Sequence, residues 1–257
     1  MLYNWQCLFT GIIVAAGVGI LHTIYAKGHL KADLMPVDIA INLMCVLASK
    51  VAAQTYSTAL PEPIPIFNCT SGSVIPFTWY QLDSHYECLL KYPFENMIWY
   101  PYKTPMKNNY YHDRICRLLY HWIPAYCIDA VIYIARLKPI NLVKIISKMT
   151  KAIGALEYFS TREWNWRTEN VSILYNELSC GDQSLYNFSF RNFEDWSAYF
   201  ENYCLGAREF AMKSDPMTIN ACRKKLKKFY IAKQMLNMFF MIIFCVFLSV
   251  LWKYAFQ

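Results

Sequence analysis

The run M-L-N-M-F-F-M-I-I-F-C-V-F-L-S-V-L-W, Met235–Trp252, constrains the architecture of this chain more than any other stretch. Its eighteen residues carry no charge, and only Asn237 and Ser249 are polar. As a helix the run is about 27 Å long, which is close to the thickness of the hydrocarbon core of a bilayer. We therefore predict a transmembrane helix over residues 229–252, in preference to a buried core helix.

The charges around this run indicate its orientation. The basic segment R-K-K-L-K-K, Arg223–Lys228, and Lys233 precede the run, whereas only Lys253 follows it. Positive charge favours the cytoplasmic side, so we expect a single-pass membrane protein with a cytosolic body. The segment could instead bind nucleic acid, but its place at the edge of a span favours anionic headgroups. We therefore expect membrane lipids as partners and no nucleic acid.

Composition sets further limits. The 257 residues are 56% hydrophobic and 17% aromatic, which is rich for a soluble protein. The ten cysteines are irregularly spaced and form no C-x-x-C pair, so we expect reduced, buried thiols rather than disulfides or a zinc site. His112 and Cys116 stand four residues apart, but two ligands do not make a metal site, and none is expected.

The first 95 residues predict helices packed with strands. The apolar run Leu8–Leu21 is too short to cross a membrane, and we interpret it as core whose glycines allow tight packing. The stretch Pro63–Thr70 resembles either an edge strand or a strand that is ended by a turn. Asp38 is expected to cap a largely buried helix. The apolar residues of that helix are Ile39, Ile41, Met44, Cys45, Leu47 and Ala48.

A third apolar run, Ile123–Leu137, leaves two interpretations open. Asp129 near its centre and its length of fifteen residues argue against a spanning helix. A helical hairpin could lie on the membrane surface or be buried in the domain. The helix expected to follow is amphipathic. Lys144, Lys148 and Lys151 share one face, and Ile146, Met149, Ile153 and Leu156 share the other.

Three motifs in the first part of the chain carry a resemblance to a known family. They are T-G-I-I-V-A-A-G-V-G-I-L-H-T-I-Y at 10–25, A-D-L-M-P-V-D-I-A-I-N at 32–42 and F-N-C-T-S-G-S-V-I-P-F-T-W at 67–79. In order and spacing they resemble the middle portion of alcohol-forming fatty acyl-CoA reductases.

The resemblance continues through most of the chain. I-W-Y-P-Y at 98–102, W-I-P-A-Y-C-I-D-A at 122–130, E-Y-F-S-T-R-E-W-N-W at 157–166 and Y-C-L-G-A-R-E-F at 203–210 are similar to the helical male sterility region of the family, particularly of its insect members. It implies an α/β remnant of an extended short-chain dehydrogenase fold over residues 1–95. A mainly α-helical domain at 96–228 and the transmembrane helix at 229–252 would follow.

The resemblance also implies a function. Members reduce a long-chain acyl-CoA to a primary fatty alcohol with NADPH, in lipid and wax biosynthesis, at the endoplasmic reticulum or the peroxisome. The family's Gly-rich cofactor loop and its catalytic Tyr-x-x-x-Lys pair do not occur in these 257 residues, so no catalytic or cofactor-binding residue is assigned. We expect an N-terminally truncated reductase that is inactive alone. The alternative is a non-catalytic membrane-anchored relative, stable by itself or bound to a full-length reductase that it could regulate. The protein partners considered are a second copy of the chain and a full-length reductase.

Seven positions fall within the family motifs and are candidates for a substrate wall or for packing. The aromatic ones suit a protein interior or a membrane interface, because their rings are apolar and those of Trp and Tyr carry one polar atom. The seven are Asp33, Pro36, Asp38, Tyr158, Phe159, Trp164 and Trp166.

Overall fold

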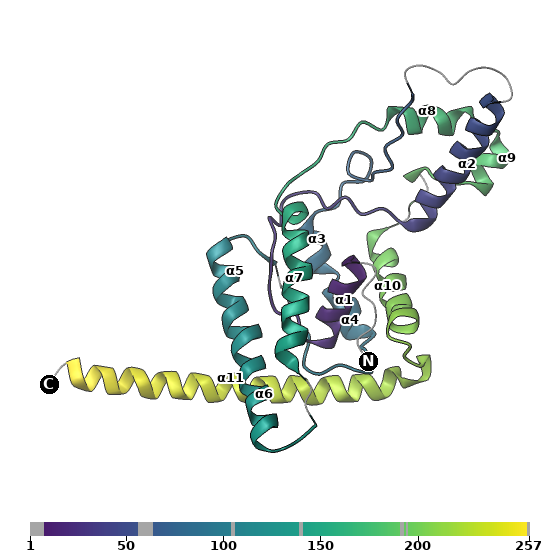
Figure 1. Ribbon diagram of the computed structural model, residues 1–257. Helices are drawn as coiled ribbons and strands as arrows, with labels where there is room; N and C mark the ends of the chain where they lie inside the picture. Colours follow the sequence, from purple (N-terminus) through teal and green to yellow (C-terminus); the bar gives the residue numbers. More distant parts are fainter. Residues whose placement is uncertain are drawn as a thin grey trace.

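The computed structural model describes residues 8–55, 64–103, 106–138, 141–190, 193 and 195–255, and Figure 1 shows the arrangement of their helices. The α-helices are α1 (Leu8–Val18), α2 (Val37–Thr55), α3 (Trp79–Ser84), α4 (Tyr86–Lys91), α5 (Tyr110–Arg117), α6 (Ile123–Ile134), α7 (Leu142–Ser160), α8 (Glu169–Glu177), α9 (Cys180–Leu185), α10 (Trp196–Gly206) and α11 (Ile219–Ala255). Two π-helical turns, η1 (Leu118–Trp122) and η3 (Ala207–Ala211), and the 3-10 turn η4 (Pro216–Thr218) extend them.

Within the described residues, strands are limited to β1 (Ile24–Tyr25) and β2 (Met106–Lys107). They pair in parallel, with Ile24 opposite Met106. The chain is therefore mostly helical, and this pair is the only part of the expected α/β layer that the described residues contain. The extended sheet of a short-chain dehydrogenase is not seen in them.

The expected strand at Pro63–Thr70 is wrong for its described part, because residues 64–70 form no strand. Pro65 has no backbone N–H to donate to a neighbouring strand. Asparagine side chains hold the segment instead. Asn170 Nδ2 donates to the Ile66 carbonyl at 2.8 Å, and Asn68 Nδ2 donates to the Arg167 carbonyl at 2.9 Å.

The main hydrophobic core confirms that residues 13–21 of the Leu8–Leu21 run are interior. It combines buried residues of α1, β1, α3 and α4 with residues of α7 and α10, so it joins parts of the chain up to position 106 with parts beyond 150. Phe77, Phe94 and Phe200 are among its most buried members. Ile153 joins it from α7, and the lysines of the opposite face of α7 are exposed, so this helix has the two faces that were predicted.

Two glycines let α1 approach its neighbours. Gly19 ends the helix with φ +84°, and a Cβ there would lie 2.3 Å from the carbonyl oxygen of Trp99. A Cβ on Gly17 would lie 2.2 Å from the ring of Phe94. Both positions therefore need glycine, as expected for tight packing and a turn.

A second lobe, formed by α2, α8 and α9, stands apart from the main body at the upper right of Figure 1. Its core contains Leu43, Val46 and Leu174. The prediction that α2 is largely buried is wrong, because Ile41 and Met44 are 49% and 63% exposed. Only the side of α2 that meets α8 and the 186–190 segment is covered.

The region after β2 differs from expectation in length. The helix that includes Ile123–Ile134 begins at Tyr110, because the turn η1 joins α5 to α6 without a break. The sequence argued against a spanning helix because the apolar run has only fifteen residues. That argument is wrong, because the helix Tyr110–Ile134 has 25 residues. A hairpin does form, because α6 packs against α7.

Within the residues that the structure describes, two helices are long and apolar enough to cross a membrane. An eighteen-residue window of the helix Tyr110–Ile134 has a mean hydropathy of 1.2 and is 22% buried, and one of the helix Pro216–Tyr254 has a mean hydropathy of 2.4 and is 0% buried. The second includes α11, which extends beyond the body at the lower left of Figure 1. The long apolar C-terminal helix is thus present where the sequence predicted it.

The described cysteines are all free thiols, as expected. The expectation that they are buried holds only for Cys116, Cys204 and Cys222, whereas five others are exposed. Cys7 lies outside the described residues.

Candidate functional site

The carboxylate of Asp33 fixes the turn at Thr70–Gly72. It accepts hydrogen bonds from Ser71 N at 2.8 Å, Ser71 Oγ at 3.1 Å and Gly72 N at 3.2 Å, and a further one from Thr70 Oγ1. The motifs at 32–42 and 67–79 therefore meet through this side chain. A carboxylate with this many donors stabilises a loop and has little capacity left for a ligand.

The other two candidate residues of the 32–42 motif lie at the start of α2. Pro36 is buried just before the helix, and Asp38 is exposed in its first turn. Asp38 is therefore not the residue before the helix, although its negative charge still favours a helix N-terminus.

A half-open cleft lies beside the Thr70 turn, between α2 and α8. Its volume is about 100 Å³, which is below the roughly 300–1,000 Å³ of pockets that hold small molecules. The wall combines apolar residues with neutral polar ones, among them Asn68, Ser172 and Asn176. None of the seven candidate residues lines it.

Cys69 is the nucleophilic group of this cleft. Burial, and next the negative charge of Asp33, raise the pKa of its thiol. A raised pKa keeps the sulfur protonated, whereas a catalytic cysteine needs a lowered one. The cleft therefore offers surface for binding and no activated nucleophile.

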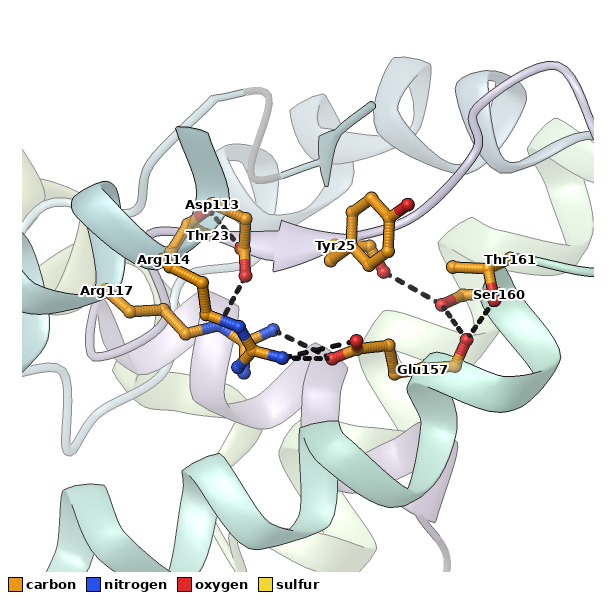
Figure 2. A network of polar contacts seen from close by, with 8 residues as sticks. All are labelled: Thr23, Tyr25, Asp113, Arg114, Arg117, Glu157, Ser160 and Thr161. Carbon is orange, nitrogen blue, oxygen red and sulfur yellow. Dashed lines mark hydrogen bonds and ion pairs between the residues drawn. The ribbon is translucent and has the colours of Figure 1, made fainter. Parts of the chain in front are cut away.

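A network of charges connects α5, α7 and β1 (Figure 2). Asp113 is fully buried and accepts a hydrogen bond from Thr23 Oγ1 at 2.8 Å. Arg117 Nε lies 2.6 Å from Asp113 Oδ2, and Arg114 Nη2 lies 2.9 Å from Glu157 Oε2. Two cations thus face two anions, which is the balance that buried charges require.

The same region ties α7 to the strand pair. Ser160 Oγ, at the end of α7, donates to the Tyr25 carbonyl at 2.8 Å (Figure 2). Because its charges are balanced and its hydroxyls are used internally, we interpret this network as the structural link between helices and strands.

Three of the four candidate aromatics form an exposed row. The rings of Tyr158 and Trp164 are 5.9 Å apart, and those of Trp164 and Trp166 are stacked at 6.0 Å. Phe159 meets Tyr158 edge-on at 5.4 Å, and the guanidinium of Arg162 lies 4.0 Å from the Tyr158 ring centre. The structure therefore brings these residues together, although none of them lines the cleft.

Arg208 is a residue whose role the sequence reasoning missed. It is 2% exposed and donates to the carbonyls of Pro93 and Asp215, the latter at 2.7 Å. It also donates to Thr218 Oγ1. The sequence signal that could have identified Arg208 is its place in the Y-C-L-G-A-R-E-F motif. The arginine attaches the start of α11 to the body.

The comparisons with known proteins agree with this motif distribution. Residues 120–214 match the family described as Male sterility protein. The chain is 35% identical over 227 residues to fatty acyl-CoA reductase 1 of Homo sapiens, with 85% of this chain and 41% of the relative covered. The corresponding protein of Gallus gallus is 34% identical over 227 residues, with the same coverage.

A second human relative gives the same result. Fatty acyl-CoA reductase 2 of Homo sapiens is 31% identical over 222 residues, with 85% of this chain and 41% of the relative covered. The chain thus spans about two fifths of the length of the curated relatives that it matches. By its male sterility domain and its similarity to these proteins, the chain belongs to the fatty acyl-CoA reductase family.

Proposed function

We propose that this chain is the downstream part of an enzyme that reduces a long-chain acyl-CoA to a primary fatty alcohol with NADPH. The proposal is carried by the 35% identity to human fatty acyl-CoA reductase 1, which extends over 85% of the chain. The contact of Asp33 with the Thr70–Gly72 turn supports it, because two of the motifs that resemble the family share one local structure.

In this proposal the 257 residues do not reduce acyl-CoA by themselves. They contain no Gly-rich loop of the kind that binds a dinucleotide and no lysine with a tyrosine four residues before it. The charges near Glu157 are paired and the Cys69 thiol is protonated, so neither provides a substitute acid, base or nucleophile. The seven motif positions are proposed to shape or support the acyl-binding part of the complete enzyme.

A chimera tests the proposal. The part of human fatty acyl-CoA reductase 1 that matches this chain is replaced by residues 10–234 of this chain, followed by the human C-terminal segment. We expect the chimera to form fatty alcohol from palmitoyl-CoA and NADPH, and the 257-residue chain alone to form none. A folded chimera without activity would contradict the reductase proposal, and alcohol formation by the chain alone would contradict its dependence on other residues.

A non-catalytic relative that binds a full-length reductase is the second candidate. The observation that favours it is the main core, in which residues up to position 106 of this chain pack against residues beyond 150. This second candidate predicts that the chain co-purifies with a full-length reductase, and that the chimera described above is inactive.

We further propose that α11 anchors the protein in the membrane of the endoplasmic reticulum or the peroxisome, with the body in the cytosol. The support is the uncharged Met235–Trp252 run with the basic Arg223–Lys228 segment on its body side. Removal of residues 235–257 is expected to release the protein into alkaline extracts. Release of the intact chain by salt alone would contradict a spanning helix.

A further inference from the structure

The continuous helix α5–η1–α6 exposes a row of large apolar side chains. A helix surface of this kind is unusual on a soluble body, where exposed apolar residues are scattered. The exposed fractions are high at the α6 end, with Val131 at 63%, Tyr133 at 85% and Ile134 at 78%. We call this surface the outer face, and it comprises Tyr111, Ile115, Leu118, Leu119, Ile123, Tyr126, Val131, Tyr133 and Ile134.

The opposite side of α5 and η1 is polar and buried in the body. Asp113, Arg117 and His121 are at most 3% exposed. By contrast, α11 is apolar on every side between Met235 and Trp252, and its large apolar side chains are exposed throughout. A helix with lipid-compatible residues all round can be surrounded by lipid, whereas one with a single apolar side can meet lipid only on that side.

Aromatic contacts place η1 where α11 leaves the body. Lys233 lies over the rings of Tyr100 and Tyr102, at 4.9 Å and 5.3 Å from their centres. The ring of Tyr102 is 6.3 Å from that of Tyr120 in η1. Figure 1 shows α6 crossing α11 rather than running alongside it. If α11 crosses a bilayer, the helix of the outer face therefore runs along the bilayer surface.

The charges at the end of the hairpin suit a phospholipid surface. Arg136, Lys138 and Lys144 are exposed around the α6–α7 connection. The acidic residue of this region, Asp129, is engaged internally, because its carboxylate accepts hydrogen bonds from Leu142 N and Val143 N, both at 2.9 Å. Exposed cations beside an apolar surface attract anionic headgroups.

We propose that the outer face lies in the plane of an anionic phospholipid bilayer and forms a second membrane contact beside α11. This inference rests on the proposed span of α11. The two contacts together orient the body, because one helix crosses the bilayer and the other lies along its surface.

Labelling from the lipid phase tests the inference. The full chain is reconstituted in vesicles of phosphatidylcholine and phosphatidylserine that contain a phospholipid with a photoactivatable diazirine in its acyl chain. After photolysis, labelled peptides are mapped by mass spectrometry. We expect label in residues 235–252 and also in 118–137, with little in α8 and α9.

Two double variants make the test specific. Val131→Asp with Ile134→Asp places charges on the outer face, and the label in 118–137 is expected to fall roughly tenfold while that in 235–252 stays. Ile173→Asp with Leu185→Asp changes apolar residues that are 55% and 70% exposed in the α8–α9 lobe, and no change of label is expected.

Each other outcome overturns the proposal in a distinguishable way. Label in 235–252 alone would leave the span and remove the second contact. Label in neither segment would refute the span itself. Unchanged label in the Val131 and Ile134 variant would show that the apolar surface is not responsible. Chain-to-chain crosslinks at 118–137 without lipid label would place a second copy of the chain on this face.

Discussion

Asp129, in α6, accepts a hydrogen bond of 2.9 Å from the backbone N–H of Leu142, the first residue of α7. The carboxylate of one helix thus caps the next one across a hairpin. Asn141, at the N-terminal boundary of α7, makes no side-chain capping bond of its own. The negative charge in this apolar hairpin is therefore explained by the unpaired N–H groups and positive dipole of the helix N-terminus that it faces.

Loss of this cap should destabilise the protein. Asp129→Ala is expected to lower the free energy of unfolding by roughly 1–2 kcal/mol, because two N–H groups of α7 lose their acceptor. Denaturant unfolding in mild detergent measures the change. Asp195→Ala is the control, since Asp195 precedes α10 without a side-chain capping bond. An equal effect of the two substitutions would show that the Asp129 cap contributes nothing.

Arg208→Ala should weaken the attachment of α11 to the body. The substitution leaves the Pro93 and Asp215 carbonyls without their buried donor, so we expect a loss of roughly 2–4 kcal/mol. The matched control is Arg223→Ala. Arg223 is exposed and donates to the Lys91 carbonyl at 3.0 Å and 2.9 Å, and its loss should cost under about 1 kcal/mol. Unfolding midpoints distinguish the two, and a larger effect at Arg223 would contradict the assignment.

The glycines of α1 and α7 should respond to alanine in opposite directions. Gly19→Ala places a Cβ 2.3 Å from the Trp99 oxygen at a positive φ, so a loss of more than about 1 kcal/mol is expected. A Cβ on Gly154 meets nothing within 4 Å. Gly154→Ala, in the middle of α7, should therefore stabilise by roughly 0.5–1 kcal/mol. Thermal unfolding provides the measurement, and destabilisation at position 154 would contradict the packing of α7.

Stability should depend on pH through His22. Burial first, and then the positive charge of Lys233, lower the pKa of His22 below its usual value of 6.5, although its bond to the Ile20 carbonyl acts in the opposite direction. The unfolded chain therefore binds a proton that the folded chain resists. As pH falls below about 6.5 this difference destabilises the fold, and at higher pH the effect is absent.

His22→Phe should reduce this loss. Unfolding midpoints at pH 7.5 and pH 5 give the difference for each protein. The wild type is expected to lose more stability between these values than the variant does. Tyr120→Phe, whose ring lies 6.1 Å from that of His22, serves as the control and should leave the difference unchanged. A variant that loses as much as the wild type would contradict the role of His22.

The sequence predicted those elements whose signal is local. In α7 the lysines and the residues Ile146 and Ile153 alternate with helical spacing, so both faces could be assigned before the fold was known. The uncharged run of α11 likewise predicted a long apolar helix, and the glycines in and after α1 predicted close packing. These signals need no knowledge of distant partners.

The predictions that failed concern features that depend on residues far away in the sequence. Residues 64–70 look strand-like, but the Ile66 carbonyl accepts a hydrogen bond from Asn170, and Asn68 donates one to the Arg167 carbonyl, so both partners lie about one hundred positions later. The sequence of α2 is apolar on most of the helix surface, yet only the side that meets α8 is buried by other residues. The pairing of Asp33 with the Thr70 turn, and of Asp129 with α7, could not be derived from spacing alone. The candidate site residues were placed by resemblance, which indicates position and not contact.

The π-helical turn η1 sets the rotational phase of everything that follows it. From Asp113, which bonds Thr23, to Asp129, which bonds Leu142, the chain advances sixteen residues. An ideal α-helix would rotate by about 160° beyond four full turns over that distance, so these two carboxylates would point in nearly opposite directions. The extra residue of the wide turn removes about 100° of that rotation. Conversion of η1 to a regular α-helix with all of its residues kept would therefore turn α6 by about 100° and carry Asp129 away from the helix that it caps. Deletion of one residue within Leu118–Trp122 would remove only the extra residue and would keep Asp129 in phase.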